Sequence, residues 1–176
     1  MRVAIATLGC KANQYDSEIM RESFEEKNFE VVLFSEPADI YVINTCTVTG
    51  RTDFQARQLI RRAHRNNPNG KIVVTGCYAQ SAPQEIQKIP GVSLVIGNPE
   101  KRKIVDLIQA AKNTPSPEIM VTPVEKELVF PERTIKKFSS RTRVFLKIQD
   151  GCNARCSYCI IPQVRGKSRK IGRAHV

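Results

Sequence analysis

Short apolar runs rich in β-branched residues alternate with helix-like stretches along the amino-terminal part of the chain. The runs lack the polar alternation of a half-exposed sheet, which is typical of strands buried on both faces. They predict strands at residues 2–8, 40–45, 71–76 and 92–96. Apolar residues spaced three or four apart among charged ones predict helices at residues 15–28, 52–65 and 100–112. This alternation predicts an α/β domain with a parallel sheet.

Prolines predict where this first domain ends. Residues 113–140 contain Pro115, Pro117 and Pro123, and proline denies the chain both helix and ladder hydrogen bonds. We therefore expect a domain at 1–112, a linker at 113–140 and the start of a second domain at 141–169. Its first strand is predicted at 144–149. In the last helix of the first domain, the run from Lys101 to Lys103 is predicted to lie on the solvated side.

Three cysteines each follow a predicted strand: Cys10, Cys46 and Cys77. Parallel strands carry their carboxyl ends at one edge of the sheet, where open α/β sheets bind ligands. The three thiols can therefore converge there, although they lie far apart in the sequence. Two interpretations stay open from the residues alone. The cysteines form a metal site, or they are three core residues, since free cysteine is among the most buried residue types.

The other three cysteines form a compact C-x3-C-x2-C motif: Cys152, Cys156 and Cys159. A four-iron cluster held by three cysteines leaves one iron open to a small molecule, whereas structural zinc requires a fourth Cys or His. Only His175 lies downstream. The tight spacing disfavours incidental or disulfide-bonded cysteines. The motif therefore predicts an iron–sulfur cluster that takes part in chemistry.

This motif resembles the signature of the radical SAM enzymes. The resemblance implies that S-adenosylmethionine binds the open iron of a [4Fe–4S] cluster on these cysteines. Reductive cleavage then releases a 5′-deoxyadenosyl radical. The resemblance also places Tyr158 near the adenine of S-adenosylmethionine.

The sequence around the strand-end cysteines resembles the methylthiotransferase family of radical SAM enzymes. The matching runs are residues 7–18, 44–49 and 75–80. The resemblance implies a second [4Fe–4S] cluster on Cys10, Cys46 and Cys77 that carries or delivers the inserted sulfur. One S-adenosylmethionine supplies the methyl group and another supplies the radical. The implied fold is an amino-terminal parallel-sheet α/β domain followed by the truncated start of a radical SAM (β/α) barrel.

Residues 9–18 and 57–63 look like the branch of this family that modifies N6-threonylcarbamoyladenosine in tRNA. Ala12 departs from that branch, which more often has Val there. Branches acting on isopentenyl-adenosine in tRNA or on an aspartate of a ribosomal protein remain alternatives, as does a non-enzymatic iron–sulfur electron-transfer module. The implied partners are tRNA and an electron donor such as flavodoxin or ferredoxin. The source of the sulfur stays open.

Positive charge is concentrated near the carboxyl end. Residues 1–131 hold 16 Lys or Arg against 15 Asp or Glu, whereas residues 132–176 hold 12 against 2, out of a total net charge of +11. Basic clusters attract phosphate backbones, although a solvated charged face is the alternative for each residue, and Arg165 is as well placed for S-adenosylmethionine or its cluster. The predicted RNA-facing residues are Arg133, Lys136, Lys137, Arg141, Arg143, Arg165, Lys167 and Arg169.

Cysteine usage and the ends of the chain complete these expectations. Six cysteines without an export signal indicate metal binding in a reducing compartment, and no apolar run approaches the roughly 18 residues of a membrane helix. We expect a cytoplasmic protein with no membrane contact. Residues 170–176 match a translated sequencing adapter and are expected to be a non-native tail. Because a complete barrel does not fit after Cys159, this chain alone is expected to bind iron without catalysing the reaction.

Overall fold

The computed structural model describes residues 1–111, 116–126, 130, 135–136 and 145–171. Its main body is a six-stranded parallel sheet with the order β2-β1-β3-β4-β5-β6. The strands are β1 (Arg2–Thr7), β2 (Glu30–Val32), β3 (Ile40–Thr45), β4 (Lys71–Gly76), β5 (Val92–Ile96) and β6 (Glu118–Met120). The predicted α/β fold with a parallel sheet is confirmed.

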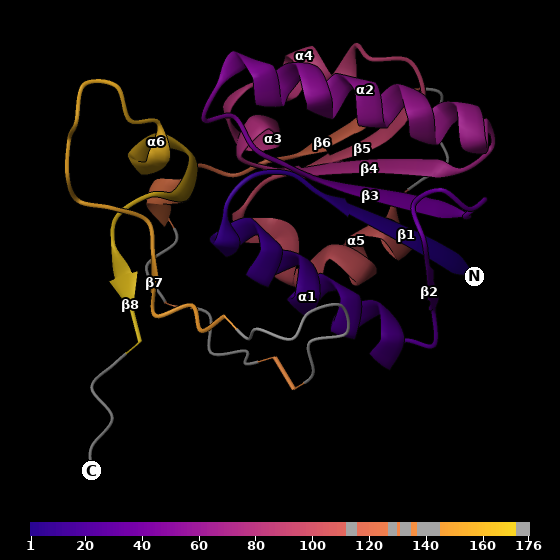
Figure 1. Cartoon of the computed structure of the whole chain (residues 1–176), viewed down its shortest axis with the longest axis horizontal. Coiled ribbons are helices and arrows are strands. Elements are labelled where there is room, and N and C mark those ends of the chain that lie inside the picture. The colour runs from indigo at the N-terminus through magenta and orange to yellow at the C-terminus, as the bar shows by residue number, and fades with distance from the viewer. Residues whose placement is uncertain (112–115, 127–129, 131–134, 137–144, 172–176) are drawn as a thin grey trace.

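Helices cover both faces of the sheet (Figure 1). One layer consists of α2 (Gly50–Asn66), α3 (Cys77–Ser81) and α4 (Pro83–Gln87). The opposite layer consists of α1 (Lys11–Glu26), the 3-10 helix η1 (Pro99–Lys103) and α5 (Ile104–Ala110). The first two predicted helices therefore begin a few residues earlier than expected. The predicted helix at 100–112 is divided into η1 and α5.

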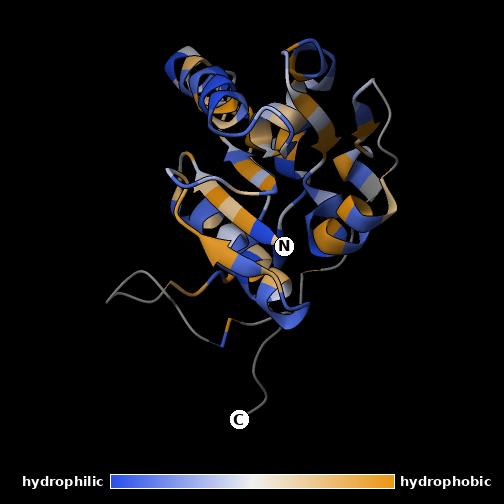
Figure 2. Ribbon diagram, turned by 90° about the vertical axis from the view of Figure 1, so that its right-hand side faces the viewer, coloured by the Kyte–Doolittle hydropathy of each residue, from blue (hydrophilic) through white to orange (hydrophobic). Residues whose placement is uncertain are grey.

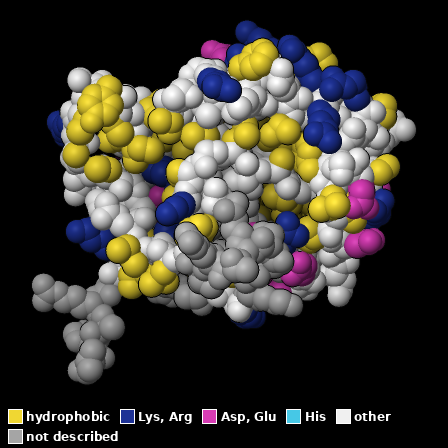
Figure 3. All heavy atoms as spheres, in the orientation of Figure 1, with side chains coloured by type: hydrophobic (Ala, Val, Ile, Leu, Met, Phe, Trp, Pro, Cys, Tyr) yellow, Lys and Arg dark blue, Asp and Glu magenta, His cyan; other side chains and the backbone are white. Residues whose placement is uncertain are grey.

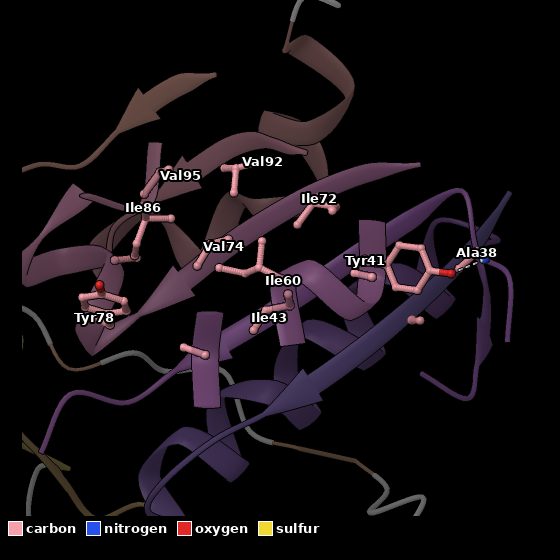
Figure 4. Packing of buried hydrophobic residues seen from close by; sticks show 14 residues of the cluster. Ala38, Tyr41, Ile43, Ile60, Ile72, Val74, Tyr78, Ile86, Val92 and Val95 are labelled. Carbon is pink, nitrogen blue, oxygen red and sulfur yellow. Dashed lines mark hydrogen bonds between the residues drawn. The ribbon is translucent and has the colours of Figure 1, made fainter. Parts of the chain in front are cut away.

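The sheet buries side chains on both faces, as the apolar runs predict. In β3, Tyr41 and Ile43 pack under α2 and α4, whereas the alternate residues Ile40 and Val42 pack against α1 and α5. Figure 4 shows the first of these cores, in which Ile60 of α2 lies over the strand residues. Figure 2 shows apolar strands between helices whose outer sides are hydrophilic. Each fully buried large side chain contributes about 1.5–3 kcal/mol of transfer free energy.

The carboxyl-terminal segment differs from expectation in two places. Residues 118–120, expected in the linker, form β6 and extend the sheet beyond residue 112. Of the strand predicted at 144–149, residues 145–148 are not in a strand and Gln149 begins β7 (Gln149–Asp150), which pairs antiparallel with β8 (Arg169–Lys170). The described residues offer 145–148 no neighbouring strand, and Leu146 and Ile148 stay 69% and 63% exposed.

Two short helices complete this segment, η2 (Val124–Lys126) and α6 (Ile161–Arg165). In Figure 1, α6 lies beside α3 at one edge of the sheet, and the two helices are in contact. Among the described residues, no helix has the length and apolar character needed to cross a membrane.

Candidate functional site

Three cysteines come together at the carboxyl edge of the sheet because β1, β3 and β4 are neighbours in the strand order. Cys10 is the residue that precedes α1, a few positions after β1. Cys46 directly follows β3, and Cys77 directly follows β4. Cys46 and Cys77 are 3% and 2% exposed, whereas Cys10 is open to solvent. The topology thus places an exposed thiol beside two buried ones.

Two glycines allow the cysteine segments to approach each other. Gly9 has a φ of +89°, and a Cβ there would lie 2.5 Å from Cys46 Cβ and 2.6 Å from Cys46 Sγ. Gly76 has a φ of +101°, and a Cβ there would overlap the carbonyl oxygen of Thr45. Both the left-handed backbone and the lack of space exclude a side chain. The Cys10 segment therefore packs directly on Cys46, and the residue before Cys77 packs on the end of β3.

The buried side chain of Asn13 joins the first two cysteine segments. Its amide nitrogen donates to the carbonyl oxygen of Leu8 at 2.9 Å and to that of Thr45 at 2.8 Å. Its own backbone carbonyl accepts a hydrogen bond from Asn44 Nδ2 at 2.8 Å. Leu8 lies two residues before Cys10, and Thr45 lies just before Cys46. An amide that satisfies buried carbonyls in both segments fixes their separation, since an unsatisfied buried group costs about 1–3 kcal/mol.

The chemistry of these thiols fits a metal cluster. Burial raises the pKa of the Cys46 thiol, and the nearness of Cys77 and Cys10 raises it further. Three thiolates crowded together repel one another unless a cation binds them. In the part of the chain that the structure describes, no three Cys, His, Asp or Glu side chains lie close enough to hold one metal ion. Thiolate sulfur is the donor that a [4Fe–4S] cluster takes from a protein, so the type of donor fits such a cluster.

The second set of cysteines lies on one loop between β7 and α6. Cys156 is exposed, and Cys152 and Cys159 are partly exposed. Two backbone hydrogen bonds shape the loop: the Cys152 N–H donates to the Gly166 carbonyl and the Cys159 N–H donates to the Cys156 carbonyl, both at 3.1 Å. Tyr158 is 90% exposed. Figure 1 shows this loop projecting beyond α6, on the side of the sheet where α3 begins.

A buried group of ion pairs, the Asp16 cluster, lies between this loop and the sheet. Asp16 is on the second turn of α1, and its carboxylate is within 2.7 Å of Lys147 Nζ, 3.1 Å of Arg165 and 3.3 Å of Lys101 Nζ. Asp150 is the second carboxylate of the cluster. The side chains of Asp16 and Asp150 are 12% and 13% exposed, so both carboxylates are shielded from water.

Arg165 links the two cysteine regions through this cluster. Its guanidinium donates to Asp150 Oδ1 at 2.8 Å, just before the cysteine loop. It also donates to Asn13 Oδ1 at 2.6 Å and to Asp16 Oδ2 at 3.1 Å, both on the helix that follows Cys10. Because Asn13 in turn bonds to the segment before Cys46, a continuous chain of hydrogen bonds connects the loop with the strand-end cysteines.

The two carboxylates of the cluster stay ionised at neutral pH. Burial alone would raise the pKa of Asp16, but Lys101, Arg165 and Lys147 hold it well below the usual range. Burial likewise opposes ionisation of Asp150, and Arg165 and Lys147 reverse that effect and lower its pKa. Burial lowers the pKa of Lys101, against the attraction of Asp16. Removing one partner from a buried pair of this kind typically costs about 3–5 kcal/mol.

Lys101 contradicts the prediction that residues 101–103 lie on a solvated helix side. It is 7% exposed and pairs with Asp16. The reason is local geometry: residues 99–103 form the 3-10 helix η1, and α5 begins only at Ile104. The tighter turn directs Lys101 toward a buried carboxylate, while Arg102 and Lys103 stay exposed.

The predicted RNA-facing residues have mixed placements. The side chains of Arg165 and Arg169 are 5% and 9% exposed and contact Asp150. Lys136 is exposed and pairs with Glu26 at 3.5 Å, and Lys167 is exposed. The remaining candidates lie outside the described residues: Arg133, Lys137, Arg141 and Arg143.

Sequence reasoning did not identify the residues that join the two cysteine regions. Asn13 and Asp16 lie three positions apart, so they share one side of α1, and both lie within the family-like run at residues 7–18. Their partner Arg165 follows about 150 positions later, and no pattern along the chain predicts that pairing.

Comparisons with known proteins match the amino-terminal domain to a family model and nearly the whole chain to several relatives. A family model described as "Uncharacterized protein family UPF0004" matches residues 2–97. Threonylcarbamoyladenosine tRNA methylthiotransferase MtaB is 47% identical in Bacillus subtilis, over 95% of this chain and 37% of that protein. The protein of the same name from Aquifex aeolicus is 41% identical, over 97% of this chain and 42% of its own length.

A more distant relative is the ribosomal protein uS12 methylthiotransferase RimO of Chloroflexus aurantiacus. It is 29% identical over 98% of this chain and 41% of its own length. The chain therefore spans between 37% and 42% of the length of these three relatives.

Proposed function

The chain belongs to the family described as UPF0004, and from this membership we propose that the full-length protein is a tRNA methylthiotransferase that acts on N6-threonylcarbamoyladenosine. The convergence of Cys10, Cys46 and Cys77 on one sheet edge carries the proposal. The names of the Bacillus subtilis and Aquifex aeolicus relatives support the substrate.

Each set of cysteines has its own role in this proposal. Cys152, Cys156 and Cys159 hold one [4Fe–4S] cluster, and the strand-end cysteines hold another. When bound, the clusters supply one-electron reduction of S-adenosylmethionine at the loop and a place for the inserted sulfur at the sheet edge. The exposed ring of Tyr158 is available to lie against the adenine of S-adenosylmethionine.

The chain's own residues set the distance between the two sites. Radical formation and sulfur delivery have to reach the same carbon of the substrate, and misplacement of reacting groups by about 1 Å can cost a hundredfold in rate. Asn13 and Arg165 are the residues whose hydrogen bonds join the two regions. A cytoplasmic location and reduction by a flavodoxin or ferredoxin also belong to the proposal.

Activity on defined substrates tests the proposal. Full-length protein is reconstituted anaerobically with iron and sulfide, then incubated with S-adenosylmethionine, a reductant and tRNA that carries N6-threonylcarbamoyladenosine. Mass spectrometry of the nucleosides should reveal the 2-methylthio derivative. Parallel reactions contain tRNA with isopentenyl-adenosine or ribosomal protein uS12. Product on one of these alone would contradict the proposed substrate, and no product on any of the three would contradict the enzyme class.

Iron counting tests the assignment of the cysteines. Two three-cysteine sites predict about eight irons per full-length chain and about four after alanine replaces Cys152, Cys156 and Cys159. The reciprocal variant, with alanine at Cys10, Cys46 and Cys77, should also retain about four. Mössbauer spectra identify the remaining cluster. Loss of all iron from the first variant would leave the strand-end cysteines as core residues.

A further inference from the structure

Helix α2 presents a row of arginines to solvent. The helix contains five arginines and a single carboxylate, Asp53. Arg57 is occupied, since it donates to the Tyr78 hydroxyl at 3.0 Å. The other four arginines are exposed, and none of them forms an ion pair with any residue that the structure describes. They are Arg51, Arg61, Arg62 and Arg65. Figure 3 shows basic side chains gathered along the edge of the molecule over α2.

These arginines do not stabilise the helix by themselves. Arg61 and Arg65 are four positions apart and Arg62 and Arg65 are three apart, and like charges at these spacings destabilise a helix by about 0.2–0.5 kcal/mol per pair. The helix is held instead by the capping box of Thr49 and by its buried apolar face. A polyanion on the exposed face would relieve the repulsion.

The arginine row borders a hollow beside the cysteine edge. The hollow measures about 570 Å³, and Arg61, Arg62 and Arg65 line it together with Leu8, the residue before Gly9 and Cys10. Two glutamine side chains in its wall can donate and accept hydrogen bonds. Phe54, on the first turns of α2, is 51% exposed and offers a face on which a base can stack.

The extent of the row indicates the class of partner. From Arg51 to Arg65 the helix rises by roughly 21 Å, so the charges extend along several repeats of a phosphate backbone rather than around one anion. Guanidinium groups match phosphate oxygens with two parallel hydrogen bonds. Among the described basic residues near the carboxyl end, Lys147, Arg165 and Arg169 are held by carboxylates, whereas Arg155, Lys167 and Lys170 are exposed.

We propose that the exposed face of α2, with Arg51, Arg61, Arg62, Arg65 and Phe54, binds the sugar–phosphate backbone of the substrate tRNA. This inference rests on the proposed function, because it takes tRNA as the substrate. It assigns a tRNA contact to the amino-terminal domain. It also directs the bound RNA past the end of β1, where Cys10 is exposed.

The test compares two double variants of the full-length protein that lose the same charge. Arg62→Gln with Arg65→Gln changes the α2 face, and glutamine is itself a good helix former. The control, Lys27→Gln with Lys103→Gln, removes two exposed lysines from the opposite layer. Fluorescence anisotropy measures the affinity for N6-threonylcarbamoyladenosine tRNA between about 50 and 200 mM salt. Circular dichroism melts check that both variants stay folded.

We expect the α2 variant to bind tRNA about five- to tenfold more weakly at the lowest salt, with a salt slope smaller by about 1 to 2, as two lost phosphate contacts require. The control should stay within about twofold of the wild type. Equal affinities for the variant and the control would overturn the inference. If the wild type still methylthiolates tRNA in that case, the proposed function stands. Failure of the wild type to bind tRNA would overturn both. Weakened binding of a protein substrate alone would assign the face to a protein.

Discussion

The two cysteine regions are built in opposite ways. Cys10, Cys46 and Cys77 come from three separate segments, and only the order of β1, β3 and β4 brings them to one place. Cys152, Cys156 and Cys159 come from a single loop, whose shape depends on backbone hydrogen bonds within residues 152–166. The first region therefore requires the whole sheet, whereas the second requires only its own sequence.

The two regions also differ in what holds them in position relative to the sheet. The strand-end cysteines are positioned by the sheet that assembles them and by the Asn13 amide that joins the Cys10 and Cys46 segments. The loop is local, and its position relative to the sheet depends on side chains such as Arg165 and Asp16. Close packing around glycine should therefore determine the stability of the strand-end cysteine region. Charge pairing should determine how firmly the cysteine loop is attached to the sheet.

The largest effect is expected at Gly76, where packing is tightest. A Cβ in Gly76→Ala would overlap the backbone of Thr45, and the φ of +101° is strained for any side chain. We expect the variant to lose at least about 4 kcal/mol of unfolding free energy or to fail to fold. Urea denaturation of the chain gives the value.

Gly50→Ala is the matched control for this change. Gly50 begins α2, and no neighbouring atom lies within 4 Å of the position that a Cβ would occupy there. Alanine there should be neutral or stabilise by up to about 1 kcal/mol. Similar losses at Gly50 and Gly76 would show that steric contact with β3 is not the cause.

Asp16→Asn tests the charge pairing and is expected to cost about 3–5 kcal/mol. The substitution keeps the shape of the side chain but leaves Lys101, Lys147 and Arg165 with one carboxylate fewer in a buried site. Limited proteolysis should cut residues 151–170 faster than in the wild type, because the attachment of the loop is weakened. Glu30→Gln, which affects an exposed pair at 3.8 Å, should change stability by less than about 0.5 kcal/mol.

The stability of the chain should also fall in acid because of this cluster. The folded-state pKa values of Asp16 and Asp150 lie below their unfolded values near 3.8. Their contribution is therefore fully present above about pH 5 and is lost as pH falls toward the folded pKa. From the magnitude typical of one such carboxylate, we expect about 2–3 kcal/mol to be lost between about pH 5 and pH 2. Denaturation series should show a flatter profile for Asp16→Asn, and an unchanged profile would contradict the assignment.

The part of the site that was predictable is the part set by strand topology. Buried β-branched runs identify strands, and parallel strands end at one edge, so the positions of Cys46 and Cys77 follow from local pattern and one topological rule. The Asp16 cluster did not follow, because Lys101 has the local pattern of a solvated helix residue. Its burial depends on a carboxylate 85 positions away.

The arginine row on α2 escaped prediction for a different reason. The positive and negative charges of residues 1–131 nearly cancel in the sum. The sum therefore does not indicate that one helix within this range has five arginines and one carboxylate. Among the described residues, no carboxylate forms an ion pair with Arg51, Arg61, Arg62 or Arg65. Local charge on one side of one helix, rather than the total for a domain, determines what a partner meets.

The smallest expected effect is the loss of stability when alanine replaces one cysteine of each region in the metal-free chain. It compares the two cysteine regions most directly. Cys77 is 2% exposed and packed at the start of α3, so Cys77→Ala should leave a small void and lower the unfolding free energy by about 1 kcal/mol. Cys156 is exposed, and Cys156→Ala should change it by less than about 0.5 kcal/mol. Chemical denaturation under reducing conditions resolves the difference. Equal losses would mean that the loop cysteine is as much a part of the packed fold as the strand-end cysteine, and the contrast between an assembled site and a local one would not hold.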